Sequence, residues 1–158
     1  MTGPSFPPDQ INILPVWTAY VDLEPTVTRG HGPTGTRYVV PIVGGTFSGA
    51  LAPEQAVPIP FKGTVVNGGF DIQREREDGV LELEAIYHML TDDGTMIEIR
   101  NNAILTHTPD DDIDYSRSRI SVEAPIGKYD WLNKRVIVGT VEVVEKEKQV
   151  LIRAFVLV

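Results

Sequence analysis

A hairpin near the middle of the chain constrains the fold more than any other stretch. The segment VLELEAIYHMLTDDGTMIEIRNNAI, residues 80–104, places two runs of strand-like residues on either side of Asp92-Asp93-Gly94-Thr95. An Asp-Gly pair between such runs is a strong hairpin signal, because Gly tolerates the positive φ that a tight turn needs. The segment therefore predicts two antiparallel strands joined by this turn.

Each arm of this hairpin has one charged and one apolar face, because alternate side chains of a strand point to opposite sides. The first arm sets polar side chains against apolar ones: Glu82, Glu84 and His88 against Leu81, Leu83, Tyr87 and Met89. The second arm repeats the pattern, with Glu98 and Arg100 against Ile97 and Ile99. By this parity Tyr87 and Glu84 face one interior together only if a bulge lies between them.

The rest of the chain also consists of strand-like runs separated by turn residues. Further strands are predicted over residues 11–23, 37–51, 65–76, 120–125, 135–144 and 149–158. Residues 24–36, rich in Gly, Pro and Thr, are predicted to form a loop, and residues 126–134 a one-turn helix or loop that packs an aromatic side chain over one end of the fold. The tip at residues 145–148 joins the last two strands as a further hairpin.

Two glycine pairs interrupt these strands. Gly44-Gly45 divides residues 37–51 into two strands and marks a bulge, a barrel corner or a close approach of the backbone to another group. Gly68-Gly69, after Asn67, is interpreted as a bulge within one strand rather than as a turn.

No segment shows apolar residues recurring at helical spacing over eleven or more positions. The chain of 158 residues has the length of one domain. An antiparallel closed or nearly closed barrel of about eight to ten strands with little helix is therefore predicted over residues 11–158, with a sandwich as the alternative architecture. Closure is favoured because it removes the exposed edges of the sheet. Residues 1–10 are predicted to be a flexible Pro-rich lead-in.

Composition narrows the classes of partner. A net charge of −8 disfavours binding to nucleic acid. Neither a signal peptide nor an apolar run of membrane-spanning length is evident, so no membrane partner and a cytoplasmic location are expected. The chain has no Cys, and the acidic run at residues 110–112 lacks the spacing of a calcium loop, so no metal site is expected. The terminal strands are more apolar than one core needs, which makes a homodimer a further expectation.

Four motifs occur in an order that resembles the domain-of-unknown-function family 3237: RYVVPIVGGTFSG, GGFDIQ, LELEAIYHMLTDDGTMIEIRN and YDWLNKRVIVGT. The resemblance implies a single β-barrel domain of lipocalin-like or calycin-like appearance. It also implies a role in small-molecule metabolism, because members occur beside biosynthetic and degradative enzymes. The chain departs from the family pattern at Ile72, where an aromatic is common, and at Asn101-Asn102-Ala103, where the family has Asn-x-Gly.

The favoured functional hypothesis is an enzyme that acts on an aromatic or polyketide-like small molecule by cofactor-free proton transfer, as a cyclase, dehydratase, isomerase or other lyase. A barrel lumen with a few polar groups on an apolar wall is typical of ligand sites. Asp71 or Glu84 is the predicted base and His88 or Tyr87 the predicted acid. Arg100 and Arg117 are predicted to hold an oxyanion or carboxylate, and Tyr129 and Trp131 to close the mouth of the lumen. Arg37 and Phe47 are further predicted substrate-binding residues.

Two other hypotheses remain open. A calycin-like binding protein for an apolar or aromatic ligand would use the same pocket without chemistry, and a purely structural barrel would have its lumen filled by side chains. Hydrolase and nucleotide-binding motifs find no support, because the sequence has no Gly-x-Ser-x-Gly elbow and no helix is predicted after Gly44-Gly45.

Overall fold

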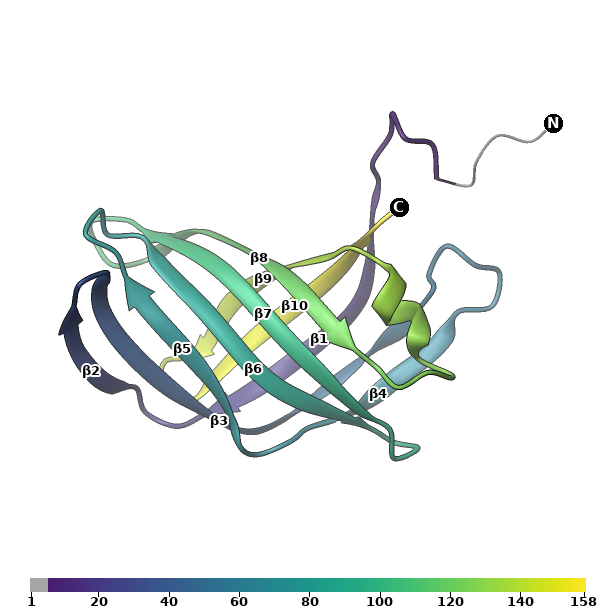
Figure 1. The fold of residues 1–158 in the computed structure, drawn as a ribbon, viewed down its shortest axis with the longest axis horizontal. Helices are drawn as coiled ribbons and strands as arrows, with labels where there is room; N and C mark the ends of the chain where they lie inside the picture. Colours follow the sequence, from purple (N-terminus) through teal and green to yellow (C-terminus); the bar gives the residue numbers. More distant parts are fainter. Residues whose placement is uncertain (1–5) are drawn as a thin grey trace.

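Ten antiparallel strands and one short 3-10 helix make up residues 6–158, the part of the chain that this computed structural model describes (Figure 1). The predicted lead-in, residues 1–10, lies partly outside the described residues. The elements are β1 (Ile13–Leu23), β2 (Val27–Gly32), β3 (Gly35–Leu51), β4 (Ile59–Val65), β5 (Gly69–Glu75), β6 (Leu81–Thr91), β7 (Met96–His107), β8 (Ile113–Glu123), η1 (Asp130–Lys134), β9 (Ile137–Glu145) and β10 (Gln149–Leu157).

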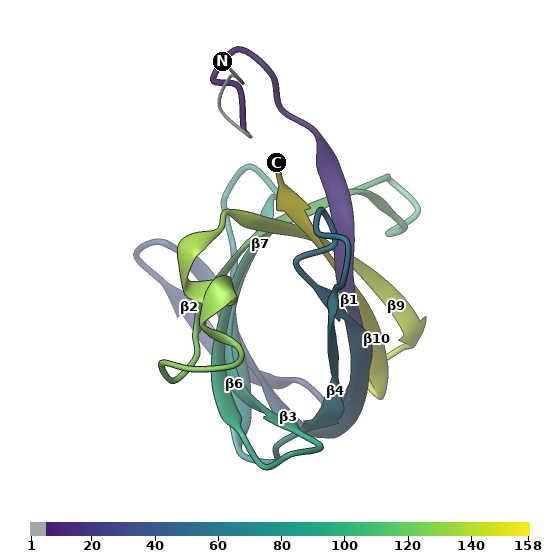
Figure 2. The same ribbon diagram turned by 90° about the vertical axis from the view of Figure 1, so that its right-hand side faces the viewer.

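The strands close into a barrel, which Figure 2 shows nearly end-on. The wall runs β1-β10-β9-β8-β7-β6, and β5 then joins β6 to β3, which returns to β1. β4 also lies between β6 and β3, but nearer the other end of the barrel, and β2 pairs with the first part of β3. The predicted all-β closed barrel is confirmed.

The long strand β3 makes this closure by changing partners at its glycine pair. Its first part pairs with β5 up to Ile42, and its second part pairs with β4 from Thr46. Gly45 has φ +137°, and a Cβ at this position would come within 2.0 Å of the Tyr20 carbonyl oxygen. The expected barrel corner is therefore present, but β3 bends through it as one continuous strand and does not break into two.

Other local predictions were also wrong. β4 was not predicted, and the strand predicted at residues 120–125 is the end of the longer β8. The stretch predicted as a loop at residues 24–36 contains β2, which pairs with β3 from Val27↔Val39 to Gly32↔Gly35. The Gly68-Gly69 pair is not a bulge: Gly68, with φ +115°, lies in the turn between β4 and β5, and Gly69 begins β5.

The β6–β7 hairpin is confirmed in detail. Its register is unbroken from Leu81↔Leu105 to Leu90↔Met96, and Gly94 has the positive φ of +87° that the tight turn requires. Because no bulge interrupts β6, Tyr87 faces the interior and Glu84 the exterior.

An aromatic cluster fills the end of the barrel next to this turn. The Phe61 ring lies 4.8 Å from that of Phe47 and 5.7 Å from those of Trp17 and Tyr129, measured between ring centroids. The adjacent helix η1 buries Trp131 and Leu132 against it. The predicted one-turn helix with an aromatic packed over one end is confirmed. Within residues 6–158 no helix is long and apolar enough to cross a membrane.

Candidate functional site

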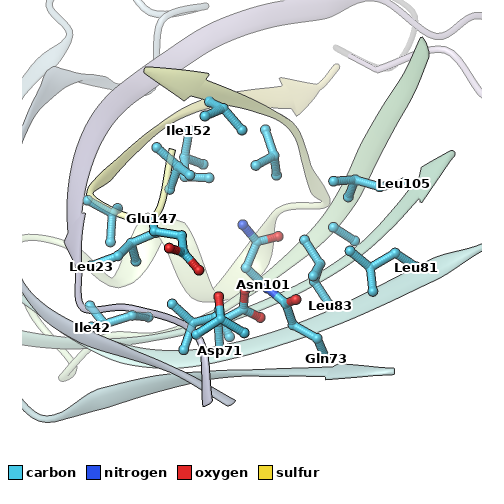
Figure 3. Close-up of a pocket in the computed structure, with 18 of the residues that line it drawn as sticks. Leu23, Ile42, Asp71, Gln73, Leu81, Leu83, Asn101, Leu105, Glu147 and Ile152 are labelled. Atoms are coloured by element: carbon cyan, nitrogen blue, oxygen red, sulfur yellow. Dashed lines mark hydrogen bonds between the residues drawn. The ribbon is translucent and has the colours of Figure 1, made fainter. Parts of the chain in front are cut away.

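The other half of the barrel is hollow. Its cavity, here called the lumen, has a volume of about 290 Å³ and an almost wholly apolar wall (Figure 3). The labelled apolar side chains come from β1, β3, β6, β7 and β10: Leu23, Ile42, Leu81, Leu83, Leu105 and Ile152. The lumen reaches the barrel end formed by Thr26 after β1, His107 at the end of β7 and Lys146 and Glu147 in the β9–β10 turn.

Four polar side chains interrupt the apolar wall deep in the lumen: Asp71 and Gln73 of β5, Tyr87 of β6 and Asn101 of β7. The strand register brings them together, because Asp71 lies opposite Ala85 and Ala85 lies opposite Asn101. The small Ala85 side chain leaves space between the carboxyl and the amide. These four residues are called the polar floor below.

Three atoms of the polar floor are shielded from solvent and have no hydrogen-bond partner within residues 6–158: Asp71 Oδ1, Tyr87 Oη and Asn101 Oδ1. The other carboxylate oxygen, Asp71 Oδ2, accepts a hydrogen bond of 2.8 Å from Gln73 Nε2. Buried polar atoms are normally paired, and one left unpaired costs about 1–3 kcal/mol. Three such atoms in one cavity are what a site built to receive a polar ligand group would contain.

Burial sets the proton affinities of the polar floor. It raises the pKa of the Asp71 carboxyl to about 6, although the hydrogen bond from Gln73 acts in the opposite direction. Burial also raises the pKa of the Tyr87 phenol, and the nearby Asp71 charge adds to this effect. Near neutral pH the site thus holds a carboxylate able to accept a proton beside a phenol that keeps its own.

Two of the predicted catalytic residues, Asp71 and Tyr87, lie in the lumen, and the other two do not. Glu84 and His88 are exposed on the outer face of β6. Glu84 lines a shallow hollow on the outside of the barrel. The prediction that these two side chains face the lumen is corrected, since the even-numbered side chains of β6 point outward throughout its unbroken pairing with β7.

The predicted arginine clamp is also on the outer face. Arg37 lines the same outer hollow as Glu84, and Arg100 lies 3.6 Å from Glu98 on its own strand. Arg117 is exposed, and its guanidinium lies 5.6 Å from the ring centre of Tyr115. None of the three lines the lumen, so the expected contacts with a carboxylate held there are corrected.

The aromatic side chains predicted to contact the substrate lie at the filled end of the barrel, away from the open end of the lumen. Phe47 and Tyr129 belong to the aromatic cluster, and Trp131 packs beside them while its Nε1 donates to Glu54 at 3.3 Å. The Tyr129 hydroxyl donates to Asp93 at 2.9 Å. These side chains close the filled end of the barrel rather than gate the lumen.

Gln73 and Asn101 were missed as site residues. Strand parity could have found both, because Gln73 shares a face with Asp71, and Asn101 shares one with Ile99 and Ala103. Among the described residues no group of three or more His, Asp or Glu side chains is placed to hold a metal ion.

Comparison with known proteins agrees with this architecture. A UPF0311 protein of Clostridium acetobutylicum is 30% identical over 143 residues, which cover 82% of this chain and 84% of that protein. A beta-barrel like protein of Acinetobacter baumannii has a TM-score of 0.78 at 27% identity, with 98% of this chain and 100% of that one covered. An enzyme from Penicillium herquei, at a TM-score of 0.71 and 19% identity over 96% of this chain and 98% of that one, shares the fold. The model of the family described as "Protein of unknown function (DUF3237)" matches residues 11–157, and the chain therefore belongs to that family.

Proposed function

We propose that this protein is an enzyme that carries out cofactor-free acid–base chemistry on an uncharged aromatic or polyketide-like molecule held in the lumen. The polar floor is the observation that carries the proposal: three unpaired, shielded polar atoms meet deep in a cavity whose wall is mostly apolar. A concave apolar site with a few convergent polar groups and a perturbed pKa is typical of an active site.

Each polar side chain has a role that follows from its surroundings. Asp71 is the base, because its pKa of about 6 lets it accept and release a proton near neutral pH, and its Oδ1 is free. Gln73 holds the other oxygen and so fixes the carboxylate plane. Tyr87 is the acid or hydrogen-bond donor toward a carbonyl oxygen, and the Asn101 amide orients the same group.

The charge of the lumen favours an uncharged substrate. The arginines first considered as a clamp lie outside, and the charged group at the polar floor is the Asp71 carboxylate. An anionic group placed beside it would be repelled in a medium of low dielectric constant. The reactions that remain are those in which one proton leaves carbon or oxygen and another is returned, as in a cyclase, dehydratase or isomerase.

The shared fold supports the proposal in outline. The Penicillium herquei protein of the same fold is described as an enzyme, so a barrel of this shape is compatible with catalysis. The polar floor described above is a feature of this chain, and the proposed chemistry rests on it.

The test is proton exchange catalysed by the purified protein. Uncharged aromatic and polyketide-like carbonyl compounds would be incubated with it in D₂O, and deuterium incorporation and product formation followed by mass spectrometry. We expect Asp71→Asn to reduce the rate at least 100-fold and Tyr87→Phe at least tenfold. The matched control is Glu84→Gln, which makes the same kind of change on the outer face and should leave the rate within twofold.

The second candidate is a calycin-like binding protein, which the apolar wall favours on its own. It predicts that compounds bind in the lumen with micromolar or better affinity but that neither the parent chain nor any variant exchanges a proton. Equal exchange rates in the parent and Asp71→Asn proteins would contradict the enzyme proposal while leaving this second candidate intact.

A further inference from the structure

The strand pairing of the barrel wall is incomplete between β8 and β9. These strands pair only from Ser118↔Gly139 to Ile120↔Ile137. On their other sides both are paired along nearly their whole length, β8 with β7 from Glu98↔Glu123 to His107↔Ile113 and β9 with β10 from Gln149↔Glu145 to Val156↔Ile137. The unpaired stretch, in which residues 113–117 of β8 face residues 140–145 of β9, is called the seam below.

One hydrogen bond crosses the seam where the strands begin to part. The backbone N–H of Val141 donates at 2.9 Å to the side-chain hydroxyl of Ser116. The partner is a side chain where a paired strand would offer a carbonyl. The Ser116 carbonyl accepts instead from Arg117 Nη1 at 2.7 Å. The two strands are therefore held together here by a contact that a rotation of one serine side chain could release.

The seam connects the lumen with the outside. Ile113, Val141 and Val143 line the lumen and also line an outer hollow of about 760 Å³ that lies along β8 and β9. The rim of this hollow carries exposed apolar side chains, with Tyr115 51% and Val143 47% accessible to solvent. These three aliphatic side chains thus connect the lumen with a surface hollow whose outer rim also carries charged side chains, among them Asp114 and Glu142.

The end of the barrel offers the alternative route, along the barrel axis. The β9–β10 turn places Lys146 and Glu147 there, and the Glu147 carboxylate points into the lumen in Figure 3. A molecule entering along the barrel axis would pass these charges, and partial loss of their hydration would cost free energy. The charged seam residues Asp114, Arg117 and Glu142 line the outer hollow but not the lumen. The three seam residues that line both are aliphatic: Ile113, Val141 and Val143.

We propose that uncharged apolar ligands enter and leave the lumen sideways through the seam, and that the Ser116–Val141 hydrogen bond must break for the two strands to separate. The proposal rests on the lumen being the ligand site, as in the proposed function, but not on the chemistry carried out there. It predicts that fastening the seam slows loading and release together, because a barrier on the route changes both rates and leaves the equilibrium affinity unchanged.

The chain has no Cys, so a single engineered disulfide can fasten the seam. The 2.9 Å contact between Ser116 Oγ and the Val141 N–H keeps the two Cα atoms within roughly 7 Å, near the range that a disulfide spans. The test variant is Ser116→Cys with Val141→Cys. The control is Asn102→Cys with Arg119→Cys, an in-register pair in the fully paired β7–β8 wall whose side chains do not line the lumen.

The measurement is stopped-flow binding of the uncharged dye N-phenylnaphthylamine, whose fluorescence rises in an apolar site. Oxidation of the seam pair should lower the association and dissociation rate constants at least tenfold at unchanged affinity, and reduction should restore them. The control pair should change them less than twofold. Ala103→Trp, which fills the lumen, should abolish the signal and so locate the dye.

Equal rates in the oxidised and reduced seam variants would overturn lateral entry, and the lumen would still stand as the site of the proposed function. A dye signal that survives Ala103→Trp, or no signal in the parent chain, would overturn lateral entry as well, because the lumen would then not take up an apolar molecule. Proton exchange lost in Asp71→Asn is measured separately, so failure of the two proposals can be told apart.

Discussion

Two opposing effects act on the pKa of Asp71. Burial disfavours the charged carboxylate, and one hydrogen bond from Gln73 favours it. Burial dominates, and the pKa rises to about 6. A carboxyl in this state weakens the fold at neutral pH, because the folded protein must carry a poorly hydrated charge. Such a cost is common at functional sites, where stability is lost in exchange for reactivity.

The pH dependence of stability should therefore change when Asp71 is replaced by Asn. The folded carboxyl binds its proton more tightly than the unfolded one, so its contribution to the unfolding free energy is complete below the ordinary pKa and falls as pH rises through about 6. At about 1.4 kcal/mol per unit of pKa, the shift corresponds to roughly 3 kcal/mol. Urea unfolding of both proteins should show Asp71→Asn gaining up to this amount relative to the parent between pH 4 and 7.5. A difference that stays constant over that range would contradict the assignment.

The turn between β6 and β7 also anchors the segment that precedes η1. Its Asp93 accepts hydrogen bonds from Tyr129 at 2.9 Å and from Lys128 and Thr95 at 3.2 Å each, and also from Thr91. These donors hold the pKa of the Asp93 carboxyl well below its usual range. The turn thus ties the segment that leads into η1 to the filled end of the barrel.

Asp93→Ala should loosen this end without opening the barrel wall. We expect the amides of η1, residues 130–134, to exchange with D₂O at least tenfold faster, because the contact with Tyr129 that docks the segment is lost. Asp92→Ala is the matched control, since the neighbouring carboxylate reaches only Lys62, at 3.6 Å, within the described chain. Equal protection of η1 in both variants would show that the Asp93 contacts do not hold it. The Asp93 contribution to the unfolding free energy should also fall as pH drops below about 4, because the carboxyl of the unfolded chain binds a proton there while the folded one stays ionised.

The corner of β3 depends on the absence of a side chain at Gly45. A Cβ there would meet the Tyr20 carbonyl oxygen at 2.0 Å, whereas Gly79, which also has positive φ, has nothing within 4 Å. Both Gly→Ala changes bear the cost of positive φ, about 1 kcal/mol, but only Gly45→Ala adds a clash between backbones. Thermal unfolding should show Gly45→Ala destabilised by several kcal/mol and Gly79→Ala by about 1 kcal/mol. Similar losses would mean that β3 can shift away from β1.

Strand runs and tight turns could be predicted from the sequence, because local chemistry decides them. The Asp-Gly turn and the period of two in β6 and β7 are examples. β2 was missed because Gly and Thr dominate it, and it pairs only because β3 extends beyond β1 to offer it an edge. Gly68-Gly69 was misassigned because the same pair suits a bulge and a turn, and long-range pairing decides between them.

Which face of each strand points inward could not be settled from a single strand. Parity correctly placed Tyr87 and Glu84 on opposite faces of β6. It could not tell whether a row of charged side chains lines a ligand site or faces solvent. Closure of the barrel determines which faces point inward, because it gives the apolar faces one shared interior and places Glu84, His88 and Arg100 outside. Parity places Asn101 on the same face as Ile99 and Ala103, but its position across Ala85 from Asp71 depends on the register of three strands, which no local pattern contains.

At the scale of the whole molecule the barrel has two unequal halves. The aromatic cluster and η1 fill one half, and the lumen occupies the other, with the polar floor between them. The filled half keeps water away from the polar floor, while the open half and the seam leave it reachable by a ligand. The pKa of Asp71 therefore reports on the arrangement of the entire barrel.

The most direct test of this account is a titration of the Asp71 carboxyl carbon by NMR in the folded protein, with Asp71→Asn used to assign the signal. We expect a midpoint of about 6. The midpoint should also move when a ligand occupies the lumen, because the ligand changes the hydration and hydrogen bonding of Oδ1. A midpoint near 4, the ordinary value for Asp, unchanged by any ligand, would contradict the claim that the polar floor is a dry acid–base site.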